Sequence, residues 1–243
     1  MKWRVLQRYV WPLRSTLAHP QWLFYRQERY LRQWLHMHAR GSVLDVGCAG
    51  GAAAAQLAPE CAYVGVDFPA TANDLYATRP QIFADGAWLP FTDDSFDTVL
   101  LLEVLEHVTE PERVLSEAAR VLKPGGRMLF SMPFLYPVHD APHDYRRYTE
   151  YGLRHAFERA GLLVERMEPR QRGLEAVGLL ANFALCEEVM DALRQRHWRL
   201  LLAPLLLSAI PVINLLAWMF AGLGGSWRLA CGHRVIACKA SGA

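Results

Sequence analysis

Three acidic residues, each following a short apolar run, indicate where a nucleoside would bind. Asp45 precedes a glycine-rich turn that begins at Gly47, and such a turn brings backbone N–H groups close to a ligand. Asp67 lies 20 residues after Gly47, the spacing at which a carboxylate accepts hydrogen bonds from ribose hydroxyls. Asp85, followed by Gly86, is placed to accept a hydrogen bond from the exocyclic amine of a base. A nucleoside at the carboxyl edge of a parallel sheet would explain all three positions.

The composition of the turn distinguishes between nucleoside ligands. The dinucleotide fingerprint G-x-G-x-x-G would require glycine at positions 49 and 52, where the chain has Ala49 and Ala52. Asp45 beside the turn would repel a pyrophosphate, but it would attract the ammonium group of an amino acid. We therefore expect a ligand in which adenosine is joined to an amino acid without a phosphate.

Several motifs, in consistent order and spacing, point to one protein family. They are VLDVGCAGG at 43–51, VGVD at 64–67, LPF at 89–91 with SFD at 95–97, LEH at 105–107 and LKPGG at 122–126. Through them, about residues 41–168 resemble a class I S-adenosylmethionine-dependent methyltransferase of type 11. The resemblance implies S-adenosyl-L-methionine as cofactor. Ala49 replaces the middle glycine of the common G-x-G-x-G turn, which should be tolerated if residue 49 does not need a positive φ.

The same resemblance implies a role for each cofactor contact. The turn and the residues after the fourth strand would hold the methionine part, Asp67 the ribose, Phe68 the adenine ring, and Asp85 with Gly86 the adenine edge. Each acid taken alone could instead be a strand-end or capping residue. The implied cofactor-binding residues are Asp45, Gly47, Cys48, Ala49, Gly51, Asp67, Phe68, Asp85, Gly86, Leu102 and Glu103.

A second group of titratable residues could activate an acceptor. Methyl transfer from a sulfonium depends on proximity and orientation, but an alcohol acceptor must also lose its proton to a positioned base. The polar loop after the fifth strand offers His139 or His143 as that base, with Asp140 or Asp144 to orient it. His107 is a further candidate, and the alternative is that it caps the next helix.

The rest of that loop could bind the acceptor. Arg146 and Arg147 could hold an anionic group such as a phosphate. In the alternative, Asp144 and Arg147 form a structural ion pair while Tyr145 and Tyr148 pack the loop. The string HDYRRYT at 143–149 resembles methyltransferases of bacterial surface-polysaccharide and lipid-linked glycan genes.

The elements that position these residues alternate between strand and helix, which predicts an α/β fold. We expect a Rossmann-like, mostly parallel sheet of seven strands with an antiparallel last strand and helices on both faces. Residues 41–168 and 228–243 would form this methyltransferase domain. The alanine-rich segment 52–58 should begin a helix. Expected strands are 42–46, 63–66, 81–84, 98–102, 127–132, 162–167 and 228–239, with helices at 110–122 and 149–160.

The N-terminal segment 1–40 is basic and aromatic, and we expect a peripheral helical arm. Its composition suits an anionic membrane surface or a nucleic acid, although an amphipathic helix with a solvated face would look the same. The net charge of +2 does not require a nucleic-acid partner. The 5 cysteines form no CxxC pair or metal-ligand pattern, so we expect a reducing compartment and a reaction without a metal.

Between the last two strands lies an apolar insert, residues 169–227. Its first half predicts a helix from 174 to about 198, and residues 200–227 contain no charged side chain. Neighbouring strands must both return to one side of a membrane, which argues against a single crossing. Pro204 and Pro211 favour a broken or re-entrant segment over a straight helix. We expect an element lying in the membrane interface; the alternatives are a buried apolar cap, a homodimer interface or a spanning hairpin.

The sequence therefore predicts a cytoplasmic methyltransferase, peripheral or monotopic on the inner face of the cell membrane. Its acceptor would be hydrophobic or lipid-linked, with an oxygen of a surface glycan favoured. The alternatives are a quinone or small-lipid methyltransferase and a catalytically silent cofactor-binding protein. A nucleic-acid substrate is not expected, because Leu102-Glu103-Val104 stands where an Asn-Pro-Pro-aromatic motif would follow the fourth strand.

Overall fold

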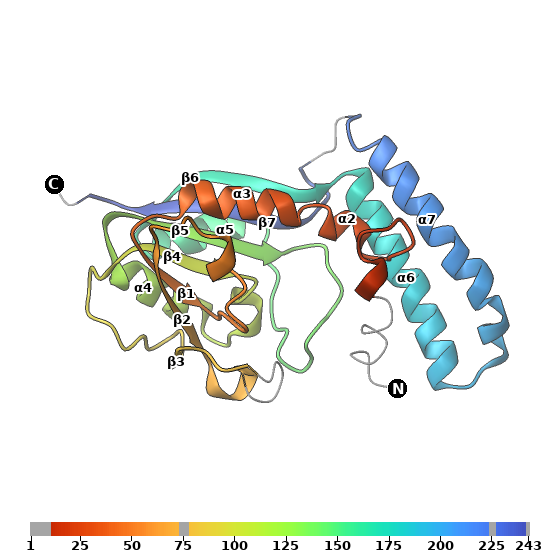
Figure 1. Cartoon of the computed structure of the whole chain (residues 1–243), viewed down its shortest axis with the longest axis horizontal. Helices are drawn as coiled ribbons and strands as arrows, with labels where there is room; N and C mark the ends of the chain where they lie inside the picture. The colour runs from red at the N-terminus through yellow and green to blue at the C-terminus, as the bar shows by residue number, and fades with distance from the viewer. Residues whose placement is uncertain (1–10, 73–77, 224–226, 242–243) are drawn as a thin grey trace. The chain divides into compact units, whose positions relative to one another are not determined.

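The computed structural model describes residues 11–72, 78–223 and 227–241 (Figure 1). The chain divides into two compact units. The sheet unit consists of Tyr30–Phe134, Val138–Glu168 and Gly232–Ala243. The helical unit consists of Met1–Arg29, Leu135–Pro137 and Pro169–Cys231, and the part of the expected arm at 1–10 lies outside the described residues.

The sheet unit is built on a sheet of 7 strands in the order β3-β2-β1-β4-β5-β7-β6. Strands β1 to β5 pair in parallel and β7 pairs antiparallel with β5, as the sequence predicted. The strands are β1 (Ser42–Val46), β2 (Ala62–Asp67), β3 (Ile82–Phe83), β4 (Phe96–Leu102), β5 (Leu122–Pro133), β6 (Leu162–Arg172) and β7 (Ala230–Lys239).

Alternating residues of the central strands face two different hydrophobic cores. On one face, Phe130 meets Phe157 of α5 (Glu150–Arg159) with ring centroids 5.2 Å apart, and α4 (Pro111–Val121) packs beside it. On the other face, Leu100 packs with Trp34 and Leu35 of α3 (Glu28–His38). The segment expected to be peripheral thus supplies two buried residues to the core, because the apolar stripe of α3 covers the sheet.

Three local expectations about the sheet unit were wrong. The alanine-rich segment 52–58 forms turns and a short 3-10 helix, η2 (Ala54–Gln56), rather than the start of an α-helix. The LKPGG segment belongs to β5, so α4 ends at Val121 and passes directly into a strand. β3 has only 2 residues, and Asp85 follows it in an isolated bridge with Trp88. In the first case turn geometry overrode helix propensity, and in the second strand pairing extended β5 through the Pro-Gly-Gly segment.

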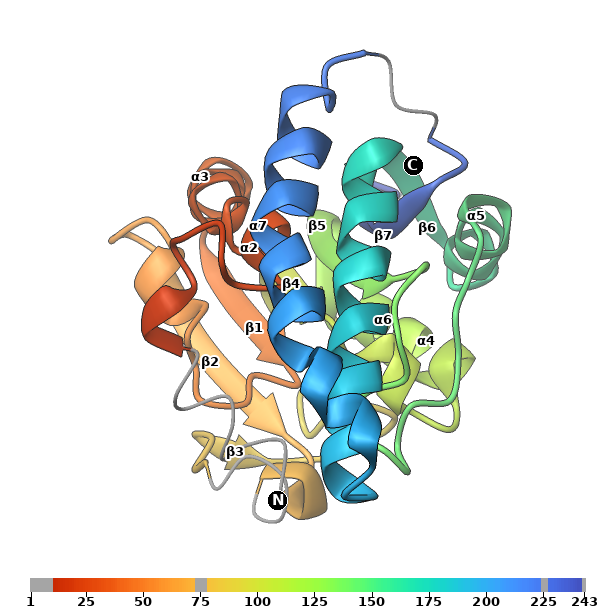
Figure 2. The ribbon, with the colours of Figure 1, turned by 90° about the vertical axis from the view of Figure 1, so that its right-hand side faces the viewer.

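The helical unit is organised around two long helices that run side by side in opposite directions, α6 (Leu174–Arg194) and α7 (Ala203–Met219) (Figure 2). Gly178 allows close approach, since a Cβ there would lie 2.7 Å from the Cβ of Ala217. Asn182 Nδ2 donates to Asn214 Oδ1 at 2.8 Å, and both side chains are fully buried. The short elements η1 (Trp11–Leu13), α2 (Trp22–Tyr25) and η5 (Trp198–Leu202) complete the unit.

The expected break at the prolines of the insert was wrong. α7 continues as one α-helix through Pro211, and Pro204 lies in its first turn, where a missing N–H costs nothing. Asn214, three residues after the interior proline, ties the helix to the N-terminal segment. Its Nδ2 donates to the carbonyl of Leu17 at 2.7 Å and to that of His19 at 3.0 Å.

Candidate functional site

The turn after β1 has the backbone shape of a ligand cradle. Gly47 has a φ of +74°, and a Cβ at this position would lie 2.4 Å from Cγ2 of Val104. Gly51 also has a positive φ, of 71°. Ala49 has a φ of 46°, which corrects the expectation that position 49 might avoid the left-handed region. A non-glycine residue there costs about 1–2 kcal/mol, so neighbouring contacts must hold this conformation.

Asp67 holds Ala49 in this left-handed conformation. Its carboxylate is only 5% exposed, and Oδ2 accepts a hydrogen bond of 2.6 Å from the amide of Ala49. Oδ1 accepts from the amide of Phe68 at 2.7 Å and from the hydroxyl of Thr71 at 3.1 Å. A carboxylate has about four acceptor positions, so Oδ2 retains capacity for a ribose hydroxyl. The exposed ring of Phe68 lies next to it in the chain, where the resemblance places the adenine.

Asp45 is a buried carboxyl group that fits a cationic ligand. It is 3% exposed and accepts a hydrogen bond of 2.8 Å from the hydroxyl of Tyr63. Burial raises the pKa of Asp45 to about 7, and the charge of Asp67 raises it further, whereas the Tyr63 hydrogen bond opposes the shift. A nearby ammonium group would restore the ionised form. The buried acid therefore fits the amino-acid end of the implied cofactor.

The remaining expected cofactor residues lie at the same carboxyl edge of the parallel strands (Figure 1). A Cβ on Gly86 would lie 3.2 Å from Val46 at the end of β1, so the segment after β3 passes close to the turn. Asp85 Oδ1 accepts from the amide of Ala87 at 2.9 Å and the side chain is otherwise exposed. After Leu102, Glu103 has a φ of 55° and its Oε1 accepts from the hydroxyl of Ser131 on β5 at 2.6 Å.

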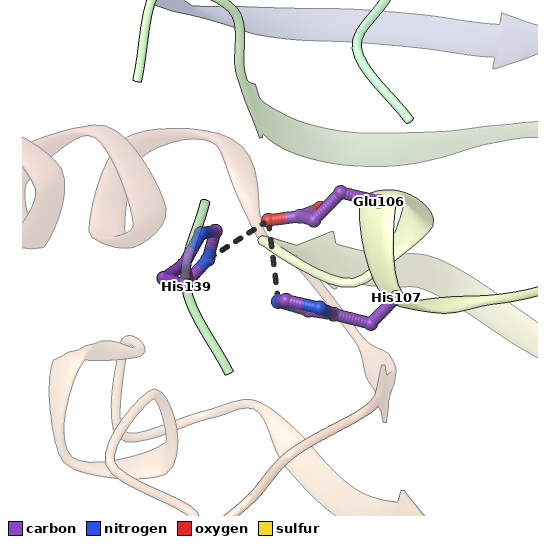
Figure 3. A group of neighbouring side chains, drawn as sticks. All are labelled: Glu106, His107 and His139. Carbon is purple, nitrogen blue, oxygen red and sulfur yellow. Dashed lines mark ion pairs between the residues drawn. The ribbon is translucent and has the colours of Figure 1, made fainter. Parts of the chain in front are cut away.

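Beyond Glu103, three side chains converge in a group that joins two segments distant in the sequence (Figure 3). Glu106 and His107 lie in η4 (Leu105–His107), and His139 lies in the loop after β5. Glu106 Oε1 is 3.7 Å from His107 Nε2 and 3.9 Å from His139 Nε2. The amide of Tyr145 donates to the carbonyl of Glu106 at 2.8 Å, which anchors the loop to η4.

Burial sets the protonation of this cluster. It raises the pKa of Glu106 to about 9, helped by the negative charge of Glu103. It lowers the pKa of His107, although the hydrogen bond between Nδ1 and the carbonyl of His143 works in the opposite direction. Sequence reasoning predicted both histidines but not Glu106. The LEH motif contains this acid, but only the structure shows that it is buried and faces both imidazoles.

Asp144 and Arg147 form the ion pair that was the structural alternative. The two terminal nitrogens of the Arg147 guanidinium contact the Asp144 carboxylate, Nη2 at 2.8 Å. Burial would raise the pKa of Asp144, but the Arg147 hydrogen bonds and the amide of His139 hold it at about 2. Asp144 Oδ2 accepts a hydrogen bond of 2.9 Å from the backbone amide of His139 and lies 3.2 Å from Nδ1 of the His139 side chain. Asp144 therefore positions His139.

The other residues of the loop are placed apart from this cluster. His143 Nδ1 lies 3.2 Å from the hydroxyl of Tyr145, and the amide of His143 donates to the carbonyl of Asp140. Arg146 donates to the carbonyls of Val108 and Thr109, which ties the loop to the end of η4. The ring of Tyr148 packs against the core formed by α4 and α5, as the packing alternative had it.

The comparisons with known proteins agree with this geometry. Residues 44–130 match the model of a family described as a methyltransferase domain. Methyltransferase GfsG of Streptomyces halstedii is 34% identical over 42% of this chain and 41% of its own length. Demethylmenaquinone methyltransferase of Tropheryma whipplei (strain Twist) is 36% identical over 49% of this chain and 52% of its own. The chain thus spans about half the length of these curated relatives.

Solved structures are similar in fold. The [4+2]-cyclase SpnF matches with a TM-score of 0.55 and 19% identity, covering 88% of this chain and 81% of SpnF. Phosphoethanolamine N-methyltransferase 2 of Haemonchus contortus, solved with S-adenosyl-L-methionine, matches with a TM-score of 0.50 and 15% identity, covering 96% of this chain and 60% of that one. Because one fold can host several reactions, these likenesses show the architecture alone. Residues 44–130 thus resemble a methyltransferase domain, and the sheet order and the turn around them fit S-adenosylmethionine as its cofactor.

Proposed function

We propose that this protein methylates an oxygen atom of a hydrophobic or lipid-linked acceptor, with a surface-glycan precursor favoured, at the inner face of the cell membrane. The observation that carries the reaction is the position of the Glu106, His107 and His139 cluster. Val104 packs against Gly47 of the cofactor turn, and the cluster begins two residues further along the chain. The groups suited to activating an acceptor therefore lie beside the groups suited to the cofactor.

Each part of the sheet unit has a role in this reaction. S-adenosylmethionine supplies a methyl group on a positively charged sulfur, ready for in-line displacement. The turn at Gly47 and the carboxylate of Asp67 orient it, and the buried Asp45 balances its ammonium charge. The cluster receives the acceptor hydroxyl and promotes loss of its proton. Asp144 and Arg147 hold His139 in place, so that the loop does not need to reorganise during transfer.

The apolar surface of the helical unit supports action at a membrane. Among the described residues, one helical stretch, Trp198–Met219, is long and apolar enough to cross a bilayer. Its mean hydropathy is 2.3, and only 17% of its apolar part is buried. Ile210, Asn214 and Ala217 are buried, and the other residues of α7 are exposed or half-buried. Its large exposed apolar side chains are Leu205, Leu207, Val212, Leu215, Leu216, Trp218 and Met219.

The ends of the hairpin favour an interfacial position. Trp198, Trp218 and Trp227 are 66%, 45% and 43% exposed, and tryptophan is enriched where a protein meets lipid headgroups. Arg196 and Arg199 lie at the tip between α6 and α7, where they would face anionic lipid. A second copy of this chain is the other occupant that could cover the same face.

The reaction is tested by incubating the protein with radiolabelled S-adenosylmethionine and fractionated bacterial lipids. We expect label in the lipid-linked glycan fraction and stoichiometric formation of S-adenosylhomocysteine. Label in the quinone fraction would support the second candidate, which is favoured by relatives named for menaquinone and ubiquinone synthesis. Cofactor binding without turnover in any fraction would contradict the enzyme and favour a silent binding protein.

Membrane binding is tested on two exposed positions of α7. We expect the double variant Leu205→Ser and Val212→Ser to bind vesicles of phosphatidylethanolamine and phosphatidylglycerol at least about 100-fold more weakly, because each fully inserted side chain contributes roughly 1.5–3 kcal/mol. The measurement is cosedimentation. The matched control is Leu163→Ser with Met37→Ser, two similarly exposed positions of the sheet unit. Unchanged binding in the α7 variant, or a change from dimer to monomer without vesicle binding, would reject the interfacial role.

A further inference from the structure

Glu106 has an environment that a structural carboxyl group rarely has. Its side chain is 0% exposed, and neither oxygen has a hydrogen-bond partner among the described residues. The two imidazole nitrogens that face it stand at 3.7 and 3.9 Å, beyond the range of a hydrogen bond. Burying such a group without a partner is costly, so a side chain of this kind calls for a specific reason.

The tautomer of His107 leaves a lone pair directed toward Glu106. Its Nδ1 lies 2.8 Å from the carbonyl oxygen of His143, and a carbonyl can only accept. The hydrogen must therefore be on Nδ1, and Nε2 carries the lone pair. Metal-binding histidines are commonly fixed in this way, by a backbone carbonyl bound to the nitrogen that does not touch the metal.

His139 has the same arrangement with a carboxylate as its orienting group. Nδ1 lies 3.2 Å from Oδ2 of Asp144, and Arg147 keeps that carboxylate ionised. The nearby carboxylate favours the tautomer with its hydrogen on Nδ1, which presents Nε2 to Glu106 (Figure 3). A carboxylate, a histidine and a metal in this order form a recurrent unit of zinc sites.

We propose that Glu106 Oε1, His107 Nε2 and His139 Nε2 bind a divalent transition-metal cation of the zinc class. The three atoms lie within 4.8 Å of one another. Ligands at about 2.1 Å from a tetrahedral zinc stand about 3.4 Å apart. The distances of 3.7 and 3.9 Å from Glu106 Oε1 therefore need to shorten by a few tenths of an ångström, and the two imidazole nitrogens, which lie within 4.8 Å of each other, by up to about 1.4 Å, which rotation of the His139 side chain in its loop can supply. Two imidazoles and one carboxylate suit zinc, cobalt or iron, whereas magnesium and calcium prefer oxygen ligands.

The charges around the cluster complement a dication. The carboxylates that face it are Glu106 itself, Glu103 from the end of β4 and Asp144 from the loop, and Arg147 is the guanidinium that opposes them. Three carboxylates and one guanidinium leave a net negative charge around the cluster once Glu106 is ionised. A buried region of this kind favours a cation strongly, because the effective dielectric constant is low.

The use of this cation rests on the proposed function, whereas its binding does not. A three-ligand site keeps a coordination position for the acceptor hydroxyl, whose pKa falls on the cation. The O–H bond breaks and the proton leaves to solvent. The resulting alkoxide forms the O–CH3 bond while the S–CH3 bond breaks, and the electron pair stays on sulfur as neutral S-adenosylhomocysteine. His139 then acts as a ligand rather than as the base.

The test uses the full-length protein after treatment with a chelator and dialysis. After zinc is added back and unbound metal is removed, we expect one equivalent of Zn²⁺ by elemental analysis, and cobalt titration of the stripped protein should produce visible absorption bands of a site with nitrogen ligands. Glu106→Gln and His139→Gln should each weaken cobalt binding at least 100-fold, and Asp144→Asn, which removes the charge that orients His139 and pairs with Arg147, about 10- to 100-fold. Glu158→Gln and His155→Gln, at exposed positions of α5, are matched controls.

Two results would overturn the site: cobalt bands unchanged in both ligand variants, or binding of zinc and cobalt no tighter than in a protein without such a cluster. The variants are compared only after circular dichroism shows a native spectrum, and His139→Gln in the surface loop provides the readout if Glu106→Gln does not fold. Calorimetry with S-adenosylmethionine is run in parallel. Metal binding without any turnover would refute the proposed reaction and leave the metal site standing.

Discussion

Replacing Asp67 with alanine is expected to weaken the binding of S-adenosylmethionine by about 100-fold. A hydrogen bond from a ribose hydroxyl to the charged Oδ2 contributes about 1.5–3 kcal/mol, and the variant loses it. It also loses the acceptor that holds Ala49 at its positive φ, so the turn itself should relax. Isothermal titration calorimetry measures the affinity.

The fold of the Asp67→Ala variant should survive, because the residue lies at the end of β2 and outside both cores of the sheet. Asp93→Ala is the matched control, since its side chain is 72% exposed and lies in the segment before β4, at the other end of the strands. Unchanged affinity in Asp67→Ala would refute the position assigned to the ribose.

Asp45→Asn is expected to have opposite effects on stability and on cofactor binding. The folded chain holds Asp45 with a pKa of about 7, against 3.8 for the free side chain. The folded state therefore binds more protons, and stability falls as pH rises from about 4 through 7. Asparagine removes this loss. At pH 8 we expect a free energy of unfolding about 2–4 kcal/mol higher than in the parent, and no difference near pH 4.

The same substitution should reduce the affinity for S-adenosylmethionine about 10-fold or more at pH 8, because the ammonium loses its counter-charge. Urea unfolding without cofactor at several pH values measures the first effect, and calorimetry measures the second. Asp191→Asn, an exposed acid of α6, is the control for a general change in net charge. A stability difference that does not vary with pH would show that Asp45 is not the titrating group.

The sheet and the cofactor edge could be predicted because their signals are local. Apolar runs ending in Asp45 and Asp67 mark two strand ends, and parallel pairing of β1 with β2 brings such ends together. The uninterrupted run of β4 identified the buried centre of the sheet. These features depend on nearest neighbours along the chain and on one rule of sheet geometry.

The acceptor cluster could not be predicted in full because it depends on distant contacts. The loop carrying His139 folds over η4 and contacts Glu106, and no residue near Glu106 in the sequence predicts this contact. The positive φ of Ala49 likewise depends on a carboxylate on the next strand. α7 continues through Pro211, and Asn214, three residues later, is held by partners near the start of the chain that local sequence patterns do not reveal.

The buried pair Asn182 and Asn214 has a consequence for how the hairpin behaves in lipid. Leucines on facing helices are nearly interchangeable, so an apolar pair can slide by a turn at little cost when water is absent. An amide that donates across the pair has one correct register, and any slip leaves polar groups in hydrocarbon without partners. The asparagines therefore hold α6 and α7 in one alignment, which the proposed insertion of the outer face of α7 into lipid would leave unchanged.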